Sequence, residues 1–230
     1  MKISFKDKSL SEKIILILSL AVWVESCIVM AGWIFNIDFL TRILPNGINM
    51  KFTTALMFFF SSIGLYLILK MVKDNYELSA TVLPGIALLL FLIMGVILLS
   101  NITNTKTGLL ANITGTQTGI ENLFVLKGNS TYSSGAGNPA LITILNFILF
   151  GLACLNTLFD FSNRQKIFKF IAWFIIIISL VSMIGYIFSA PVLYFEIDGL
   201  TPIAFNTALS FFLLGIGLLV ISKVKTIYEI

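Results

Sequence analysis

The chain contains no histidine among its 230 residues. This absence excludes imidazole ligation of haem, copper or zinc, and it excludes a catalytic triad centred on histidine. It also excludes phosphorylation of this chain on histidine. Only two cysteines are present, Cys27 and Cys154, and both fall inside apolar stretches. We interpret them as small, reduced packing residues rather than as a disulfide pair.

Charged residues are equally scarce. They make up 11% of the chain, against about 25% in a typical soluble domain, while hydrophobic residues make up 58%. The mean hydropathy is +1.01. A surface with so little charge would aggregate in water, so the lipid bilayer is the expected solvent. The basic residues stand at the ends of apolar runs rather than in one patch, which argues against nucleic acid as a partner.

Six apolar segments are long enough to cross the hydrocarbon core, which requires about 20 residues of helix. Helices are required because unpaired backbone groups in lipid are costly, and the sequence lacks the alternating pattern of a barrel. We predict an all-α integral membrane protein, residues 1–230 forming one membrane domain. The predicted spans are Ile14–Phe35, Phe52–Met71, Thr81–Ser100, Ala140–Leu158, Phe168–Phe188 and Pro202–Ile221.

The basic residues predict the orientation of these spans in a cell membrane. With a cytoplasmic N-terminus, 11 lysines and arginines fall on the inside and 4 on the outside. The inside set is Lys2, Lys6, Lys8, Lys13, Lys70, Lys73, Arg164, Lys166, Lys169, Lys223 and Lys225. The outside set is Arg42, Lys51, Lys106 and Lys127. The excess of inside positive charge places both termini in the cytoplasm.

Under this topology the long loop 101–139 faces outside. It contains three N-x-[ST] sequons, at Asn101, Asn112 and Asn129, which are possible glycosylation sites. Chance is the competing explanation, because the loop is rich in asparagine, threonine, serine and glycine. We also expect one short strand, near residues 122–127.

Residues 30–70 and 183–223 are two copies of one segment. With an offset of 153 residues and no gap, 16 of the 41 positions are identical. The matches include a glycine, a Thr-Ala-Leu run, a second glycine and a terminal lysine in a single register. Apolar composition alone does not produce such an alignment. The repeated unit is the end of one apolar helix, a loop and a second apolar helix.

A weaker third copy lies in the fourth predicted span. The run Thr143–Phe147 corresponds to Thr54–Phe58 and Thr207–Phe211, and small residues follow each run at matched positions. Small residues let helix backbones approach closely in lipid. We therefore predict three repeated helical hairpins related by an axis along the membrane normal. The expected helix-packing residues are Thr54, Gly64, Thr143, Gly151, Thr207, Gly215 and Gly217.

The two outer loops of the first and last hairpins, 36–51 and 189–201, combine apolar and acidic residues. These loops either anchor the protein at the membrane interface through their apolar side chains or cap an outward-facing pocket between hairpins.

Glu25 is the one carboxyl near the middle of a span, about 18 Å into the first helix. An intramembrane carboxyl is costly and is a functional candidate by default. It either binds a proton or ligand, forms a structural hydrogen bond, or contacts a partner subunit. Its expected hydrogen-bond partners are Asn146, Ser61, Ser62 or Ser182. Its repeat counterpart is Ile178, so its role is not part of the duplicated design.

Asn146 and Asn206 are polar residues near the outer ends of their spans. They either hold helices together or bind a ligand. The sequence shows no phosphate-binding loop, GxSxG, HExxH, paired-carboxylate or CxxC pattern. We therefore expect no enzymatic activity, no cofactor and no bound metal.

The runs Gly185-Tyr-Ile-Phe-Ser-Ala-Pro-Val-Leu-Tyr194 and Leu200-Thr-Pro-Ile-Ala-Phe-Asn-Thr-Ala-Leu-Ser-Phe-Phe-Leu-Leu-Gly215 resemble a known type of module. They are similar to the multi-pass N-terminal membrane regions of bacterial and archaeal sensor histidine kinases and PAS-containing signalling proteins. The resemblance is best over 183–221 and weaker over 30–70. It implies signal input or membrane anchoring for a cytoplasmic output domain. The chain contains no PAS, kinase or cyclase region, so either that domain has been removed or a partner chain supplies it.

Three functions follow as hypotheses. The first is a non-enzymatic sensor, anchoring or accessory module in signal transduction, bound to a partner chain. The second is a structural subunit of a larger membrane complex. The third is a small proton-linked transporter that uses Glu25; against it, the spans offer few other intramembrane polar or charged residues.

Overall fold

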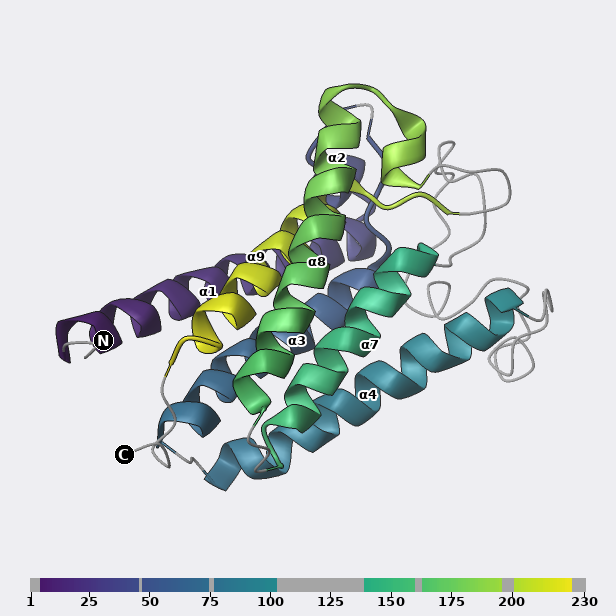
Figure 1. Cartoon of the computed structure of the whole chain (residues 1–230). Coiled ribbons are helices and arrows are strands. Elements are labelled where there is room, and N and C mark those ends of the chain that lie inside the picture. The colour runs from purple at the N-terminus through teal and green to yellow at the C-terminus, as the bar shows by residue number, and fades with distance from the viewer. Residues whose placement is uncertain are drawn as a thin grey trace.

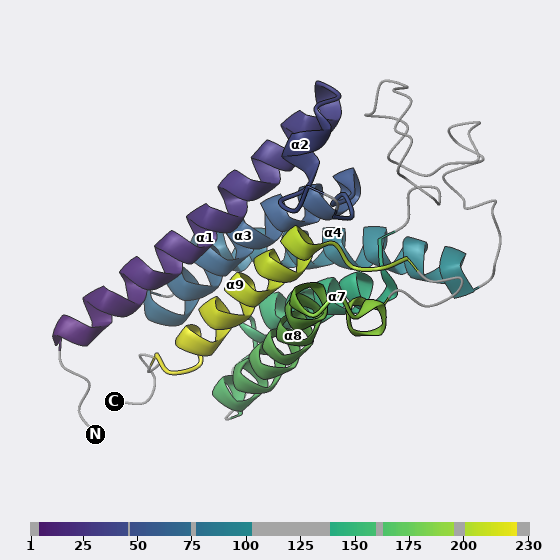
Figure 2. The same ribbon diagram turned by 90° about the horizontal axis from the view of Figure 1, so that it is seen from above.

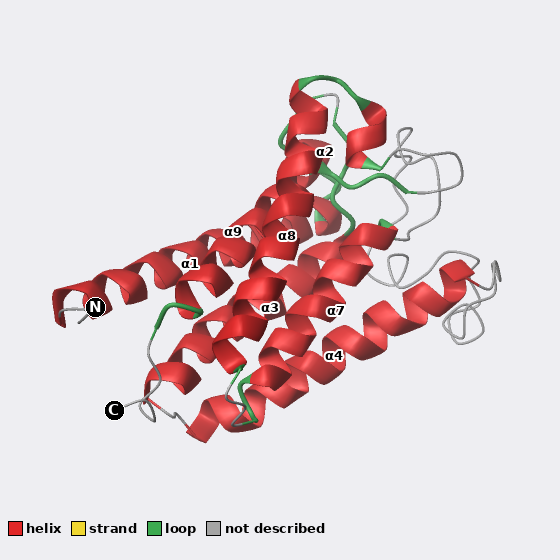
Figure 3. Cartoon of the chain, viewed as in Figure 1, coloured by secondary structure: helices red, strands yellow, loops and turns green. Residues whose placement is uncertain are grey.

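The computed structural model describes residues 5–45, 47–74, 77–102, 139–159, 163–195 and 201–224. Within these ranges the chain is helical and contains no strand (Figure 3). The elements are α1 (Phe5–Ile34), α2 (Asp38–Thr41), α3 (Phe52–Asp74), α4 (Glu77–Ile102), α7 (Leu141–Asn156), α8 (Arg164–Ile187), the 3-10 helix η1 (Pro191–Tyr194) and α9 (Phe205–Ile221). The strand expected near 122–127, Asn112 and Asn129 lie outside the described residues.

All six predicted spans contain a helix, but two of these helices are shorter than the other four. Four helices are long and apolar enough to cross a membrane: Leu10–Ile34, Phe52–Lys73, Glu77–Leu99 and Arg164–Ile187. The other two, Leu141–Asn156 and Phe205–Ile221, are shorter. α9 begins at Phe205 rather than at Pro202, because residues 201–204 form no helix and the backbone of Ala204 is extended. Hydropathy therefore overstated the length of this helix.

The helices form three antiparallel pairs, α1 with α3, α4 with α7 and α8 with α9 (Figure 1). Each pair contacts the next: α1 lies against α9, α4 against α3 and α8 against α7. Figure 2 shows α9 between α1 and α8. We call α3, α7 and α9 the inner helices, and α1, α4 and α8 the outer helices. Exposed large hydrophobic side chains occur along all three outer helices, whereas the described side chains of α3 and α9 include none.

The two ends of the bundle differ. α1, α4 and α8 begin, and α3, α7 and α9 finish, at the same end (Figure 1), which we call the proximal end. Side chains tie the elements together there: Lys73 forms an ion pair with Glu12, and Gln165 Nε2 donates to the carbonyl of Val224 at 3.3 Å. These bonds join α1 to α3, and α8 to the residues that follow α9. α2 and η1 lie at the opposite, distal end.

The segments α1–α2–α3 and α8–η1–α9 have matching backbone geometry. α1 and α8 both stop at a residue with a left-handed backbone, Asn36 (φ 55°) and Ser189 (φ 51°). In each case the following amide donates back into the helix at 2.8 Å, from Ile37 to the Gly32 carbonyl and from Ala190 to the Gly185 carbonyl. This is the helix C-terminal motif that normally uses glycine at the left-handed position.

The matching geometry continues through both distal loops. Trp33 Nε1 donates to the Met50 carbonyl at 2.8 Å, and the Tyr186 hydroxyl donates to the Ile203 carbonyl at 2.7 Å. The donor and the acceptor of the second bond each lie 153 residues after those of the first. The donor is tryptophan in one bond and tyrosine in the other. Bonds from Met50 to Thr41 and from Ile203 to Tyr194 also match. At their tips, Phe39 and Val192 are exposed to the surroundings.

Candidate functional site

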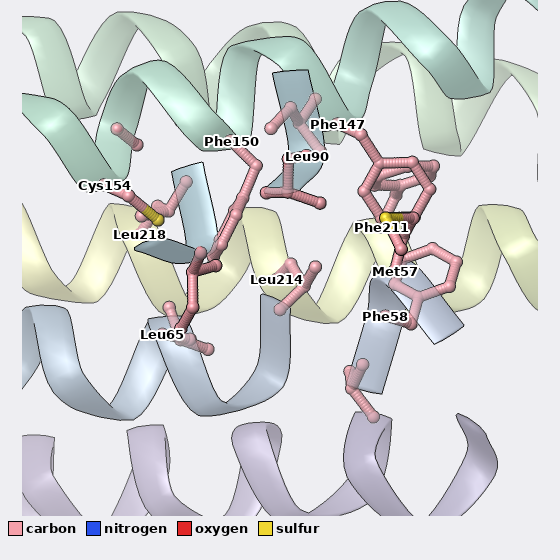
Figure 4. Close-up of a cluster of buried hydrophobic side chains, with 14 of the residues drawn as sticks. Met57, Phe58, Leu65, Leu90, Phe147, Phe150, Cys154, Phe211, Leu214 and Leu218 are labelled. Atoms are coloured by element: carbon pink, nitrogen blue, oxygen red, sulfur yellow. The ribbon is translucent and has the colours of Figure 1, made fainter. Parts of the chain in front are cut away.

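Three phenylalanine rings meet between the inner helices. Phe58 of α3, Phe147 of α7 and Phe211 of α9 lie with ring centroids 4.6–4.8 Å apart and interplanar angles of 59–62° (Figure 4). All three rings are fully buried. The nearly equal distances and angles place them around a common axis. One helical turn before each ring lies a buried threonine: the three are Thr54, Thr143 and Thr207.

The small residues that follow the rings lie where helices approach most closely. A Cβ on Gly215 would lie 2.7 Å from Ile176 of α8, and one on Gly151 would lie 2.9 Å from Phe91 of α4. Each therefore faces the outer helix of its own pair. At the third corresponding position, Ser62, the hydroxyl of Ser19 on α1 donates to the backbone carbonyl at 2.5 Å.

A second set of small residues faces the neighbouring inner helix. A Cβ on Gly217 would lie 2.6 Å from Leu65 of α3, and one on Gly64 would lie 3.5 Å from the Cys154 sulfur of α7. Leu65 and Cys154 occupy corresponding positions, 11 residues after Thr54 and Thr143. Figure 4 shows both beside Leu218 of α9, the third corresponding residue. The same contact thus recurs from α9 to α3 and from α3 to α7.

Glu25 is half-buried on α1 and faces α9. The Ser210 hydroxyl donates to its Oε2 atom at 2.5 Å. Its other oxygen, Oε1, is buried and has no hydrogen-bond partner among the described residues. None of the four partners expected from the sequence fills this role. Ser62 and Ser182 instead donate to the backbone carbonyls of Phe59 and Ile178.

Ser210 was thus missed from the sequence, although a signal was available. It is the fourth residue of the repeated run Thr207–Phe211, at the position where the other copies have Met57 and Asn146. Two of the three corresponding runs carry a polar residue there. On α9 this position faces α1, because Ser210 donates to Glu25.

Asn206 lies one turn before Ser210 on the same face of α9. Its Nδ2 atom donates to the Thr41 carbonyl of α2 at 3.1 Å, across 165 residues of sequence. Its Oδ1 atom is buried without a partner among the described residues. Asn206 and Ser210 of α9 thus contact the first hairpin at two points, Thr41 of α2 and Glu25 of α1. We call this contact the α1/α9 seam and define it by Glu25, Thr41, Asn206 and Ser210.

Asn146 lies apart from this seam, on α7. Its side chain is fully buried, and neither amide atom has a hydrogen-bond partner within the described part of the chain. Its corresponding residue on α3 is the buried Met57. Asn101 is in the last turn of α4. Among the described residues, no group of three histidine, cysteine, aspartate or glutamate side chains could hold a metal ion.

We expect Asn146→Met to raise the free energy of unfolding by about 1–2 kcal/mol, because it removes two buried polar atoms that lack partners. Met57 shows that methionine fits the corresponding position. Unfolding in mixed micelles titrated with SDS measures the change. The matched control is Asn206→Met, which removes the bond to Thr41 and is expected to lower stability by about 1 kcal/mol. A loss of stability in Asn146→Met would show that this amide is paired in the membrane.

The chain matches no protein-family model, and neither curated proteins nor solved structures match it.

Proposed function

We propose that the chain is a six-span membrane module of three repeated hairpins that serves as a signal-input, anchoring or accessory unit for a partner chain. The proximal end faces the cytoplasm, so both termini do as well. The three sequons then lie on the outside.

The repeat is supported by contacts that recur around the axis of the three phenylalanines. Each outer helix lies against the inner helix of one neighbouring pair, always in the same rotational sense: α1 on α9, α8 on α7 and α4 on α3. The glycine contacts from α9 to α3 and from α3 to α7 also share one rotational sense, opposite to that of the outer helices. These contacts are those expected if three hairpins are arranged around a three-fold axis, with each hairpin contacting its neighbours in the same way.

Six spans are supported by the alternating direction of α1, α3, α4, α7, α8 and α9. The two shorter helices, of 16 and 17 residues, would extend about 24–26 Å, slightly less than the hydrocarbon core of about 30 Å. α9 is preceded by the buried, extended residues Ile203 and Ala204, which lengthen its apolar path. α7 is preceded in the same way by the buried Ala140.

The orientation is supported by the charges of the two ends. The described basic residues at the proximal end are Lys13, Lys70, Lys73, Arg164, Lys166, Lys169 and Lys223, and those at the distal end are Arg42 and Lys51. Basic residues accumulate on the cytoplasmic side of membrane proteins. Cysteines introduced at Ser133 and at Asn163, in a chain whose two native cysteines are replaced by alanine, are therefore expected to react from opposite sides of sealed vesicles. Labelling of both from one side would contradict the topology.

The observation that favours a module over a conduit is the phenylalanine cluster. A path for ions or polar solutes through a helix bundle is lined by polar groups or water. Here the axis between the inner helices is filled by three buried aromatic rings. Aromatic side chains therefore occupy this axis, while α1 begins and α9 ends at the basic end of the bundle, which suits docking of a cytoplasmic partner.

The test is purification of the full chain from native membranes in mild detergent, with co-purifying chains identified by mass spectrometry. Stoichiometric recovery of a kinase, cyclase or receptor-like chain is the expected result. Stoichiometric recovery of subunits of a membrane enzyme would instead make the protein a structural subunit. Recovery of this chain alone would contradict the proposal, and proton-coupled uptake into liposomes by wild type and Glu25→Gln would then be measured.

A further inference from the structure

Two buried oxygen atoms in the α1/α9 seam accept no hydrogen bond from any described residue. They are Oε1 of Glu25 and Oδ1 of Asn206. An unpartnered acceptor away from water costs about 1–3 kcal/mol, and more when it belongs to a charged group. Both atoms are pure acceptors when the carboxyl is ionised. The seam therefore has a surplus of oxygen acceptors and lacks a donor or a cation.

The two oxygens lie on neighbouring helices, Glu25 on α1 and Asn206 on α9, and the carbonyl that binds Asn206 belongs to α2. Ser210 and Asn206 are four residues apart on α9, about 6 Å along its axis, and they project from one face. Ser210 fixes Glu25 through Oε2, and Asn206 is fixed through Nδ2 to the Thr41 carbonyl. In each group one atom is anchored and the other is left without a partner. Asn206 and Ser210 are each 1% exposed, so the seam is closed to bulk solvent on the α9 side.

No cationic side chain supplies the missing charge. Among the described residues Glu25 makes no ion pair, and α9 contains no lysine, arginine, aspartate or glutamate. On α3 the basic residues are Lys70 and Lys73, in the part of the helix that reaches the proximal end. On α2 and in the loop after it, the charged residues are Asp38, Arg42 and Lys51. Asp38 is acidic, Arg42 follows the Thr41 carbonyl that Asn206 already binds, and Lys51 directly precedes α3.

The donor set selects the chemistry of a ligand. Carboxylate, amide and hydroxyl oxygens are ligands of hard cations, and the seam contains no imidazole or thiolate that would select a softer metal. One carboxylate carries one negative charge. A monovalent cation would make the site neutral, whereas a divalent cation would leave one uncompensated positive charge within the membrane, which is costly.

We propose that the α1/α9 seam binds one alkali cation, with Glu25 Oε1 and Asn206 Oδ1 as ligands and the Ser210 hydroxyl positioning the carboxylate. The site goes beyond the role of a partner-docking module. It occurs once per chain, because the repeat counterpart of Glu25 is Ile178 and the position that corresponds to Ser210 on α7 is Asn146. The expected stoichiometry is one cation per chain.

The test uses the full chain in mild detergent, with sodium chloride, potassium chloride or choline chloride at equal ionic strength. A cation bound only to the folded state raises the unfolding midpoint, by about 4 °C at ten times its Kd for a chain of this size. We expect this rise with sodium or potassium and none with choline. Glu25→Gln and Asn206→Leu are expected to abolish it, and the matched control Asn146→Leu, outside the seam, is expected to retain it.

A midpoint that rises equally in choline, or a rise that persists in both seam variants, would overturn the proposal. Stabilisation by acid alone, with no alkali cation effect at any pH, would also overturn it and would assign a proton to the seam. If the seam variants do not fold, the ²³Na resonance is measured with wild type instead. Line broadening that excess potassium reverses and choline does not would support the site, and its absence would overturn it. Co-purification of a partner does not enter either measurement, so this proposal and the docking function fail independently.

Discussion

Replacing Gly215 with leucine is expected to lower the free energy of unfolding by about 3 kcal/mol, at the upper end of the usual cost of overpacking. A Cβ at this position would lie 2.7 Å from Ile176 Cγ1 and 3.3 Å from the Ala172 carbonyl oxygen. The second contact is with backbone, which cannot rotate away. α8 and α9 would have to separate along their length to admit the larger side chain. SDS-induced unfolding of the purified chain measures the loss.

The matched control for this experiment is Gly95→Leu in α4. A Cβ on Gly95 would meet no atom within 4 Å, and leucine is a better helix former than glycine by almost 1 kcal/mol. We therefore expect stability to be unchanged or slightly raised. Equal losses in the two variants would mean that glycine is needed for helix flexibility in general, and the close approach of α8 and α9 would not be the cause.

Replacing Phe211 with alanine is expected to cost about 3 kcal/mol, because it empties a volume that two other rings enclose. Lipid is as apolar as the protein interior, so the loss comes from van der Waals contacts and the cavity rather than from exposure to water. Phe58→Ala and Phe147→Ala are expected to cost the same within about 1 kcal/mol, since each ring has the other two as neighbours at 4.6–4.8 Å.

The matched control is Phe170→Ala on α8, where the side chain is 68% exposed. In a micelle this ring contacts detergent, which also fills the space left by its removal, so the expected change is within ±0.5 kcal/mol. Strongly unequal losses among Phe58, Phe147 and Phe211 would contradict a common axis. A double substitution of two axial rings is expected to cost less than the two single losses added together, because the rings share contacts.

The sequence predicted α1, α3, α4, α7, α8 and α9 because each is a nearly continuous apolar run, and hydropathy reports such runs directly. It misplaced the starts of α1 and α9 for opposite reasons. α1 extends upstream through a polar, basic leader to Phe5, and α9 starts three residues late because residues 202–204 are not helical and Ala204 is extended. Hydropathy measures how apolar a segment is, and it does not distinguish a helical backbone from an extended one.

The α1/α9 seam was only half predictable. Glu25 and Asn206 could be singled out because polar side chains are rare in these spans, but their partners depend on which helices become neighbours. The bond from Ser210 to Glu25 joins residues 185 positions apart. No local sequence pattern predicts a contact between residues so far apart in the chain. Likewise, the bonds made by Trp33 and Tyr186 have the same geometry through different chemistry, so residue identity alone underestimates how alike the two segments are.

The contact between the first and last helices has a consequence for biosynthesis. When α1 leaves the ribosome, Ser210 is still 185 residues away. At about 5–20 residues per second, that distance takes about 10–40 s to translate. During this interval the nascent chain holds an intramembrane carboxyl without its partner, and the groove that α9 fills beside α1 and α3 is open to lipid. Insertion of the last hairpin thus completes the bundle. In a chain whose translation stalls before α9, Glu25 would stay unpaired in the membrane, where quality-control proteases could recognise it.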